Sequence, residues 1–225
     1  MSSNGLTVVM TTYLPDGPVG EARLGYAKHT IDALYDVVDH GLGLLVVTHD
    51  GPQNNWLHNL SRHMDAIRLN SVIYYGPRNG IGASLNRAMH AITGNWMYIT
   101  DDWLLQKPID FGKAIALLKD YDYVRLGPLH PNLACTTKFN KELGWWLELH
   151  TGSGFTFATR PFVATKTFYN YIGPFDEGLD AYETERLYNK RVSMFSPKMA
   201  ALLSDGTEWE HIGAVEVGRE AIYTT

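Results

Sequence analysis

The chain has 225 residues, of which 45% are hydrophobic and 19% are charged, and its formal net charge at pH 7 is -5. This length is most simply one domain with a full core, and the composition is that of an ordinary globular protein. The acidic balance argues against a broad surface for nucleic acid or anionic membrane, because such surfaces are rich in lysine and arginine.

Cys135 is the only cysteine, so it can form no intramolecular disulfide, which favours a reducing, cytoplasmic setting. We expect its thiol to be a small buried apolar group. Residues 1–5 lack the basic start of a secretory signal, and no apolar run reaches the roughly 18 residues of a membrane span. The sequence therefore predicts a soluble, unprocessed protein without a membrane span.

Strand-like and helix-like segments alternate in the first half of the chain. Runs of apolar and β-branched residues predict strands, and apolar residues three or four apart predict helices. The expected strands are 6–12, 43–48, 71–75 and 96–100, and the expected helices are 23–38, 56–67 and 84–92. This βαβα order predicts an α/β fold with a doubly wound, mainly parallel sheet and helices on both faces.

The pattern changes after Pro108 into a smaller, mixed or antiparallel part. The expected helices here are 111–119, 161–171 and 181–191, and the expected strands are 123–126, 145–149 and 154–158. Residues 205–225 show little periodicity and are expected to form a flap or tail.

Two adjacent carboxylates follow the fourth expected strand, in Thr100-Asp101-Asp102-Trp103. Ligands bind at the carboxyl ends of strands in open α/β sheets, and a carboxylate pair there suits a divalent cation carrying phosphate oxygens. Taken alone, an Asp-Asp pair is more often a turn that caps the next helix.

Three further loops fall at the carboxyl ends of expected strands. They are Thr11-Thr12-Tyr13-Leu14-Pro15, Thr48-His49-Asp50-Gly51 and Gly76-Pro77-Arg78-Asn79-Gly80. Together with the acidic loop, these loops resemble the nucleotide-sugar-binding half of GT-A (Rossmann-like) glycosyltransferases of family 2. The resemblance covers residues 6–191. Neither a GxGxxG fingerprint nor a P-loop ending is present, which argues against dinucleotide-binding and ATPase functions.

The resemblance implies that these loops bind a nucleoside-diphosphate sugar. Asp50 would accept a hydrogen bond from the base, and Arg78 would contact the diphosphate or ribose. Gly80 and Gly82 would let the backbone approach the nucleotide, while Asn86 would hold that loop. The other expected donor contacts are Thr12, Tyr13, Asn79 and Asp101. Taken alone, Asp50 is equally a turn residue, and Arg78 is a solvated surface side chain.

The metal site implied by the resemblance departs from the family's usual Asp-x-Asp. The loop looks closest to a Glu-Asp-Asp-Trp version without its first carboxylate. We therefore expect Asp102 to bind Mn²⁺ or Mg²⁺ directly and Asp101 to contact the sugar or support the ligand. Glu210-His211-Ile212-Gly213 resembles a His-x-Gly element, so His211 is a further candidate ligand, although a lone histidine is more often structural.

The segment from Gly173-Pro174-Phe175-Asp176-Glu177 to Tyr182-Glu183-Thr184-Glu185 resembles the part of the family that supplies the catalytic base. That base is a carboxylate that deprotonates the acceptor hydroxyl. The family's Glu-Asp is absent here, so we expect Glu183 as the base, with Glu185 in reserve and Asp101 as a further catalytic candidate. The same acids would also complement a helix macrodipole.

The sequence therefore predicts a metal-dependent glycosyltransferase, inverting if the resemblance holds. Its single domain would comprise a donor half, 1–107, an acceptor and catalytic half, 108–204, and a C-terminal flap or tail, 205–225. The partners would be a nucleotide-sugar donor and a hydroxyl acceptor of unknown identity. The alternatives are a nucleotidyltransferase, against which the lack of a glycine-rich, lysine-containing phosphate loop argues, and a catalytically silent nucleotide-sugar or glycan-binding module.

Overall fold

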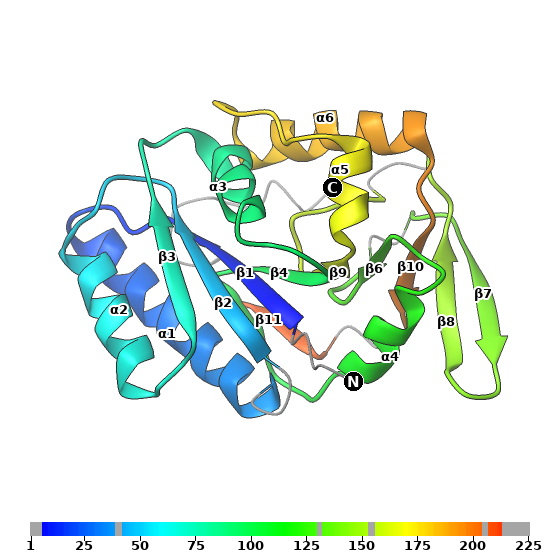
Figure 1. Cartoon of the computed structure of the whole chain (residues 1–225), viewed down its shortest axis with the longest axis horizontal. Helices are drawn as coiled ribbons and strands as arrows, with labels where there is room; N and C mark the ends of the chain where they lie inside the picture. The colour runs from blue at the N-terminus through cyan, green and yellow to red at the C-terminus, as the bar shows by residue number, and fades with distance from the viewer. Residues whose placement is uncertain (1–5, 39–41, 130–131, 153–155, 204–206, 213–225) are drawn as a thin grey trace.

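The computed structural model describes residues 6–38, 42–129, 132–152, 156–203 and 207–212. The strands of the main sheet are β1 Leu6–Thr12, β2 Leu42–His49, β3 Ser71–Tyr75, β4 Trp96–Thr100, β6 Tyr123–Arg125, β7 Cys135–Asn140, β8 Gly144–Leu149, β9 Phe162–Ala164 and β10 Met199–Leu202. They lie in the order β3-β2-β1-β4-β9-β6-β10-β8-β7 (Figure 1). Two short strands, β5 Trp103–Leu105 and β11 Trp209–His211, pair with each other in a separate sheet.

Strand directions bring several strand ends to one edge of the sheet. β1 is parallel to β2 and β4, and β2 is parallel to β3. β9 is antiparallel to both β4 and β6, so β6 runs in the same direction as β4. β10 is parallel to β6 and antiparallel to β8, which pairs antiparallel with β7. The carboxyl ends of the donor-half strands and of β6 therefore share an edge, where α/β folds bind ligands.

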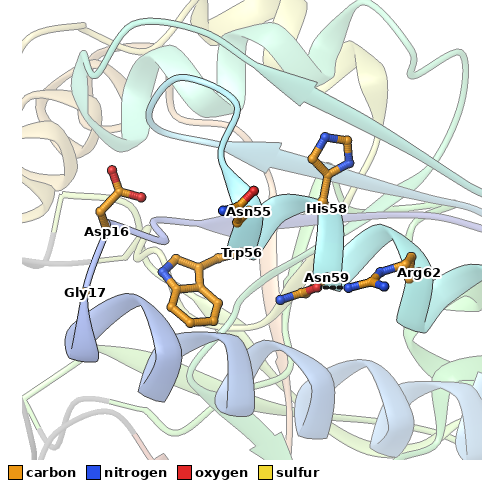
Figure 2. Close-up of a pocket in the computed structure, with 7 residues that line it drawn as sticks. All are labelled: Asp16, Gly17, Asn55, Trp56, His58, Asn59 and Arg62. Atoms are coloured by element: carbon orange, nitrogen blue, oxygen red, sulfur yellow. Dashed lines mark hydrogen bonds between the residues drawn. The ribbon is translucent and has the colours of Figure 1, made fainter.

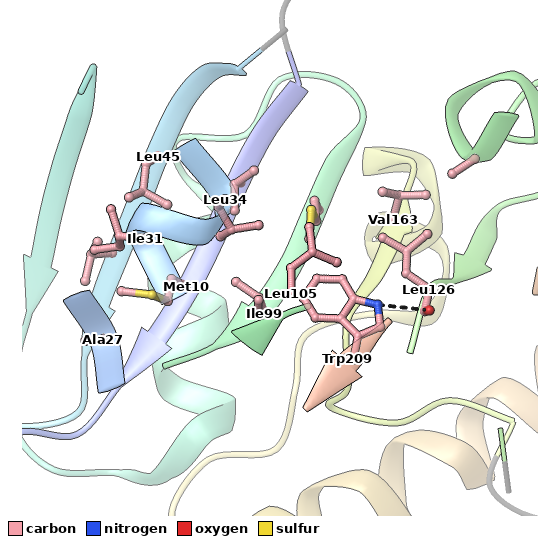
Figure 3. Packing of buried hydrophobic residues seen from close by; sticks show 14 of the residues in the cluster. Met10, Ala27, Ile31, Leu34, Leu45, Ile99, Leu105, Leu126, Val163 and Trp209 are labelled. Atoms are coloured by element: carbon pink, nitrogen blue, oxygen red, sulfur yellow. Dashed lines mark hydrogen bonds between the residues drawn. The ribbon is translucent and has the colours of Figure 1, made fainter. Parts of the chain in front are cut away.

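Helices cover both faces of the sheet (Figure 1). They are α1 Pro18–Val38, α2 Asn55–Ala66, α3 Gly80–Met89, α4 Phe111–Leu117, α5 Lys166–Ile172 and α6 Ala181–Phe195. Successive strand side chains point to opposite faces, so Val8 and Met10 join the core under α1, α2 and α4, while Val9 joins the core under α3, α5 and α6. Figure 3 shows the first core, in which Trp209 of β11 donates a hydrogen bond to the Leu126 carbonyl at 3.1 Å.

The expected parallel sheet of the first half and the expected mixed part of the second half are confirmed, while a few elements of the second half differ from expectation. Phe162–Ala164, expected to begin a helix, forms β9, because three fully buried residues in a row carry no period that separates strand from helix. Residues 156–158 form no strand, and 153–155 lie outside the described residues. Cys135 is exposed rather than buried, because β7 is the edge strand of the sheet.

Only residues 207–212 of the expected tail are described. Its Trp209–His211 pairs with Trp103–Leu105, so this part of the tail belongs to the fold. Residues 205–206 and 213–225 lie outside the described residues, and the flap expected there stays a prediction. No helix in the described part of the chain has the length and apolar character needed to cross a membrane.

Candidate functional site

Asp101 follows β4 directly and is fully buried. Thr12, at the end of β1, donates to its Oδ2 at 2.6 Å, and Arg23 of α1 pairs with its Oδ1 at 2.5 Å. Thr30 of α1 donates to its carbonyl oxygen at 3.0 Å. Burial raises the pKa of Asp101 to about 6, although the positive charge of Arg23 opposes the rise. Both carboxylate oxygens are therefore engaged inside the molecule, and neither is exposed for the expected contact with a sugar.

The sequence analysis missed Arg23. A single arginine in an amphipathic helix usually lies on the solvent side, so the local pattern gave no reason to single it out. Its partner Asp101 lies far away in the sequence, and only the sheet brings the two together.

Asp102 contacts the two-stranded sheet. Its Oδ1 accepts a hydrogen bond from Thr100 at 2.5 Å, and its Oδ2 lies 3.3 Å from Nε2 of His211. The pairing of β5 with β11 sets this distance, because His211 lies opposite Trp103 and stacks on its ring at 4.9 Å. Burial would raise the pKa of Asp102, but the hydrogen bonds from His211 and Thr100 outweigh it and hold the pKa below the usual value. The structure thus brings the two expected metal ligands together.

This donor set fits a cation shared with a nucleotide. A carboxylate oxygen beside an imidazole nitrogen suits Mn²⁺, and Mg²⁺ accepts the carboxylate. Within the described residues, no three His, Cys, Asp or Glu side chains gather in a group that could hold a metal. The remaining ligands would come from phosphate oxygens and water, as is usual for nucleotide-bound Mg²⁺.

Asp50 holds the start of α3. Its Oδ1 accepts from the backbone N–H of Asn79 at 2.8 Å, and its Oδ2 accepts from that of Gly80 at 3.1 Å. A carboxylate at a helix N-terminus satisfies free N–H groups and complements the helix dipole. Arg87 of α3 adds a positive charge 3.8 Å from Oδ1. The role of Asp50 toward a nucleotide base stays a prediction.

Tyr13 and Arg78 meet at this edge of the sheet. The Arg78 guanidinium lies 4.3 Å from the centre of the Tyr13 ring, which is a cation–π contact. Arg78 is exposed, and Tyr13 also stacks with His49 at 6.4 Å. The two loops after β1 and β3 therefore present an aromatic ring and an exposed positive charge side by side.

The glycines that begin α3 face another part of the chain. A Cβ added at Gly80 would lie 2.3 Å from the Leu179 carbonyl oxygen, and one added at Gly82 would lie 2.0 Å from that of Asp176. The side-chain amide of Asn86 donates to the Phe175 carbonyl at 2.9 Å. These residues dock the segment 175–179 onto α3. Their expected roles toward a nucleotide stay a prediction.

The two candidate bases on α6 have different surroundings. Glu183 forms an ion pair with Arg186 one turn along the helix, at 2.8 Å, and both side chains are exposed to solvent. Glu185 is half-buried, and its Oε1 accepts hydrogen bonds from the backbone N–H, at 2.6 Å, and the hydroxyl of Thr159. Burial raises the pKa of Tyr98 in β4, and the negative charges of Asp102 and Glu185 both add to this rise. Glu185 therefore lies within electrostatic reach of Tyr98, as Asp102 does.

A hollow of about 630 Å³ lies beside this site, between the loop after β1 and α2 (Figure 2). It is lined by Asp16, Gly17, Asn55, Trp56, His58, Asn59 and Arg62. None of the expected site residues lines it, so the candidate site is the group of residues at the carboxyl edge of the sheet.

No protein-family model and no curated protein matches this chain. Among solved structures, Staphylococcus aureus TarS matches 91% of the chain with a TM-score of 0.65 and 15% identity. A second TarS structure, of residues 1–349, has a TM-score of 0.63 and 16% identity. The chain spans 36% and 59% of these two structures.

A third similar structure is the 4-diphosphocytidyl-2C-methyl-D-erythritol synthase of Anaerococcus prevotii. It has a TM-score of 0.54 and 10% identity, with 92% of this chain and 93% of the synthase covered. Identities this low speak for the fold alone. The chain has the expected GT-A fold.

Proposed function

We propose that this protein transfers a sugar from a nucleoside-diphosphate sugar to a hydroxyl acceptor, with Mn²⁺ or Mg²⁺ bound at Asp102 and His211. The observation that carries the proposal is the 3.3 Å approach of these two side chains at the carboxyl end of β4. In a GT-A fold this edge is the place for a nucleotide, and a carboxylate with a lowered pKa stays ionised to hold a cation.

The bound cation would neutralise the diphosphate as it leaves. Arg78 is exposed next to Tyr13, and its guanidinium can add a charge-assisted hydrogen bond to a phosphate oxygen. Asp101 has a positioning role, because its bonds to Thr12 and Arg23 tie β1 and α1 to the loop that carries Asp102.

We assign the catalytic base to Glu185 ahead of Glu183. A base needs an oxygen that is free to accept the acceptor proton. Both bonds from Thr159 end on Oε1 of Glu185, and within the described residues its Oε2 accepts none. Attack by a hydroxyl activated there, opposite the leaving diphosphate, would invert the anomeric carbon.

The synthase match keeps nucleotidyl transfer as a second candidate function. The two reactions release different products, since sugar transfer frees a nucleoside diphosphate and nucleotidyl transfer frees pyrophosphate from a nucleoside triphosphate. A binding module would release neither.

The test uses a series of incubations, all with Mn²⁺ and a panel of hydroxyl acceptors. Each incubation contains one donor, which is a UDP-, GDP- or dTDP-sugar or the matching nucleoside triphosphate. We expect nucleoside diphosphate to appear with at least one sugar donor and to disappear in chelator. Pyrophosphate as the released product would favour the second function. If a nucleotide binds but no product is released from any substrate, the protein is a catalytically silent binding module.

A further inference from the structure

Arg125, the last residue of β6, is a buried cation that has no counter-charge among the described residues. Its side chain is 2% exposed, and a guanidinium stays protonated at any relevant pH. Within the described part of the chain, its Nε and Nη1 donate no hydrogen bond and no carboxylate forms an ion pair with it. By contrast, Arg23 pairs with Asp101 at 2.5 Å, and Arg191 pairs with Asp176 at 2.8 Å.

Arg125 lies on the acceptor side of the candidate site. It is in register with Phe162 of β9, which is in register with Tyr98 of β4, so the three side chains share one face of the sheet. Burial raises the pKa of Tyr123, the charge of Arg125 and its close approach to the Tyr123 hydroxyl oppose this rise, and the charge of Glu185 adds to it. Tyr123 therefore lies within electrostatic reach of both Arg125 and the proposed base.

The chain from Thr156 to Thr159 covers this part of β6. Its Phe157 ring packs on Tyr123 at 5.9 Å, and its backbone is held to α6 by hydrogen bonds to Asn189 and Glu185. The Thr156 hydroxyl is buried, and within the described residues it has no hydrogen-bond partner either. Within the described residues, an unpaired hydroxyl and a guanidinium with two unpaired nitrogens thus lie in two adjoining segments.

We propose that Arg125 binds an anionic oxygen group, a carboxylate or a phosphate, carried by the acceptor. A buried charge without a partner is strongly unfavourable, and a carboxylate or phosphate matches the fork of N–H groups that a guanidinium presents. The identification of the ligand as the acceptor rests on the proposed function. For an acceptor group to reach Arg125, the Thr156–Thr159 segment would have to move away from α6, to which hydrogen bonds tie it.

Thermal unfolding of the Arg125→Met variant tests this assignment, because methionine keeps an unbranched side chain and removes the charge. The measurements use chelator to keep cations off the donor site, and constant ionic strength, with sodium chloride as the reference. In chloride, removal of an uncompensated buried charge should leave the midpoint unchanged or raise it by about 2–4 °C. Sodium phosphate, sodium acetate or both should raise the midpoint of the parent protein more than that of Arg125→Met, whose own rise measures the general effect of the salt.

Three variants serve as controls. Arg23→Met should lower the midpoint, since it leaves the buried Asp101 carboxylate without its partner. Arg78→Ala should keep the response to anions, which separates Arg125 from the proposed donor site. Arg125→Lys keeps a positive charge and should keep part of the response. A response to phosphate alone identifies a phosphate group, and a response to acetate alone identifies a carboxylate.

A fall in the midpoint of Arg125→Met in chloride would overturn the proposal, because it would mean that the fold itself pairs this charge. So would the absence of any anion response in the parent protein. Sugar transfer without an anion response would remove this inference alone. If the parent protein responds to anions but releases nucleoside diphosphate from no donor, the anion site at Arg125 is supported and the proposed function is wrong.

Discussion

The Asp102 carboxylate is held in place by Thr100 and His211, so a change of its charge alone should be informative. Asp102→Asn keeps the shape of the side chain and removes most of its attraction for a cation. We expect nucleoside diphosphate to bind this variant about tenfold or more weakly in Mn²⁺, at the level that the parent protein shows in chelator. Calorimetric titration measures both affinities. Equal affinity of the parent protein in Mn²⁺ and in chelator would contradict the metal assignment.

Glu183 and Glu185 offer a matched pair of substitutions on one helix. Glu185→Gln should lower turnover by roughly 10² to 10⁴ with little change in donor affinity, because it removes the proton acceptor and keeps the shape. Glu183→Gln should be mild, since Glu183 pairs with Arg186 in solvent. Steady-state transfer rates decide between them. If Glu183→Gln is the inactive variant, the base is the one expected from the sequence.

At the level of elements, the docking of the segment 175–179 on α3 depends on glycine. Gly82→Ala would place a Cβ 2.0 Å from the backbone oxygen of Asp176, which no side-chain rotation can relieve. We expect a loss of about 1–3 kcal/mol in the free energy of unfolding, measured by urea denaturation. Gly25→Ala in α1 is the control, because its Cβ would meet nothing within 4 Å. That variant should be neutral or up to about 1 kcal/mol more stable. If Gly25→Ala lost as much stability as Gly82→Ala, the loss at Gly82 could not be assigned to its contact with Asp176.

The parallel half of the sheet was predictable because its signals are local. The strands around Val9 and Val46 are apolar runs between helices with apolar residues at helical spacing, and each unit follows the next along the chain. Asp101 and Asp102 could be placed at a strand end for the same reason, because they directly follow one of these apolar runs. Their separate roles were not predictable, since they depend on Arg23 and His211, which only the folded chain brings near.

The second half was harder to predict because its pairings are non-local. β9 is three buried residues long and lies between two strands from other parts of the chain. β5 and β11 are each three residues long and pair across most of the second half. Glycine patterns were equally ambiguous. Gly80 and Gly82 mark a close approach, but their sequence context does not say whether a ligand or a chain segment approaches.

At the scale of the whole molecule, β9 joins the two halves. It lies antiparallel between β4 and β6, which keeps both strands pointing toward the same edge. Asp102 follows β4 and Arg125 ends β6 at that edge, and the charge of Glu185 on α6 acts on Tyr98 of β4. A sheet with β6 reversed would place Arg125 at the opposite edge. The mixed topology therefore brings the proposed donor and acceptor groups together.

Stability of the whole chain should depend on pH through His49, at the end of β2. His49 is buried, and burial lowers its pKa below the usual 6.5, although the charge of Asp50 opposes this. Below pH 6.5 the unfolded chain therefore binds a proton that the folded chain does not, so stability falls as pH decreases, until the pH reaches the folded pKa.

His49→Asn removes this titration and keeps an acceptor for the Leu14 N–H, which His49 Nδ1 accepts at 3.4 Å. The other titrating groups remain in both proteins, so their contributions cancel in the difference between the two. We expect the parent protein to lose stability relative to His49→Asn as the pH is lowered from about 7.5 to about 5. Urea unfolding at several pH values measures the two curves. Parallel curves over this range would mean that His49 takes up a proton in the folded protein as easily as in the unfolded chain.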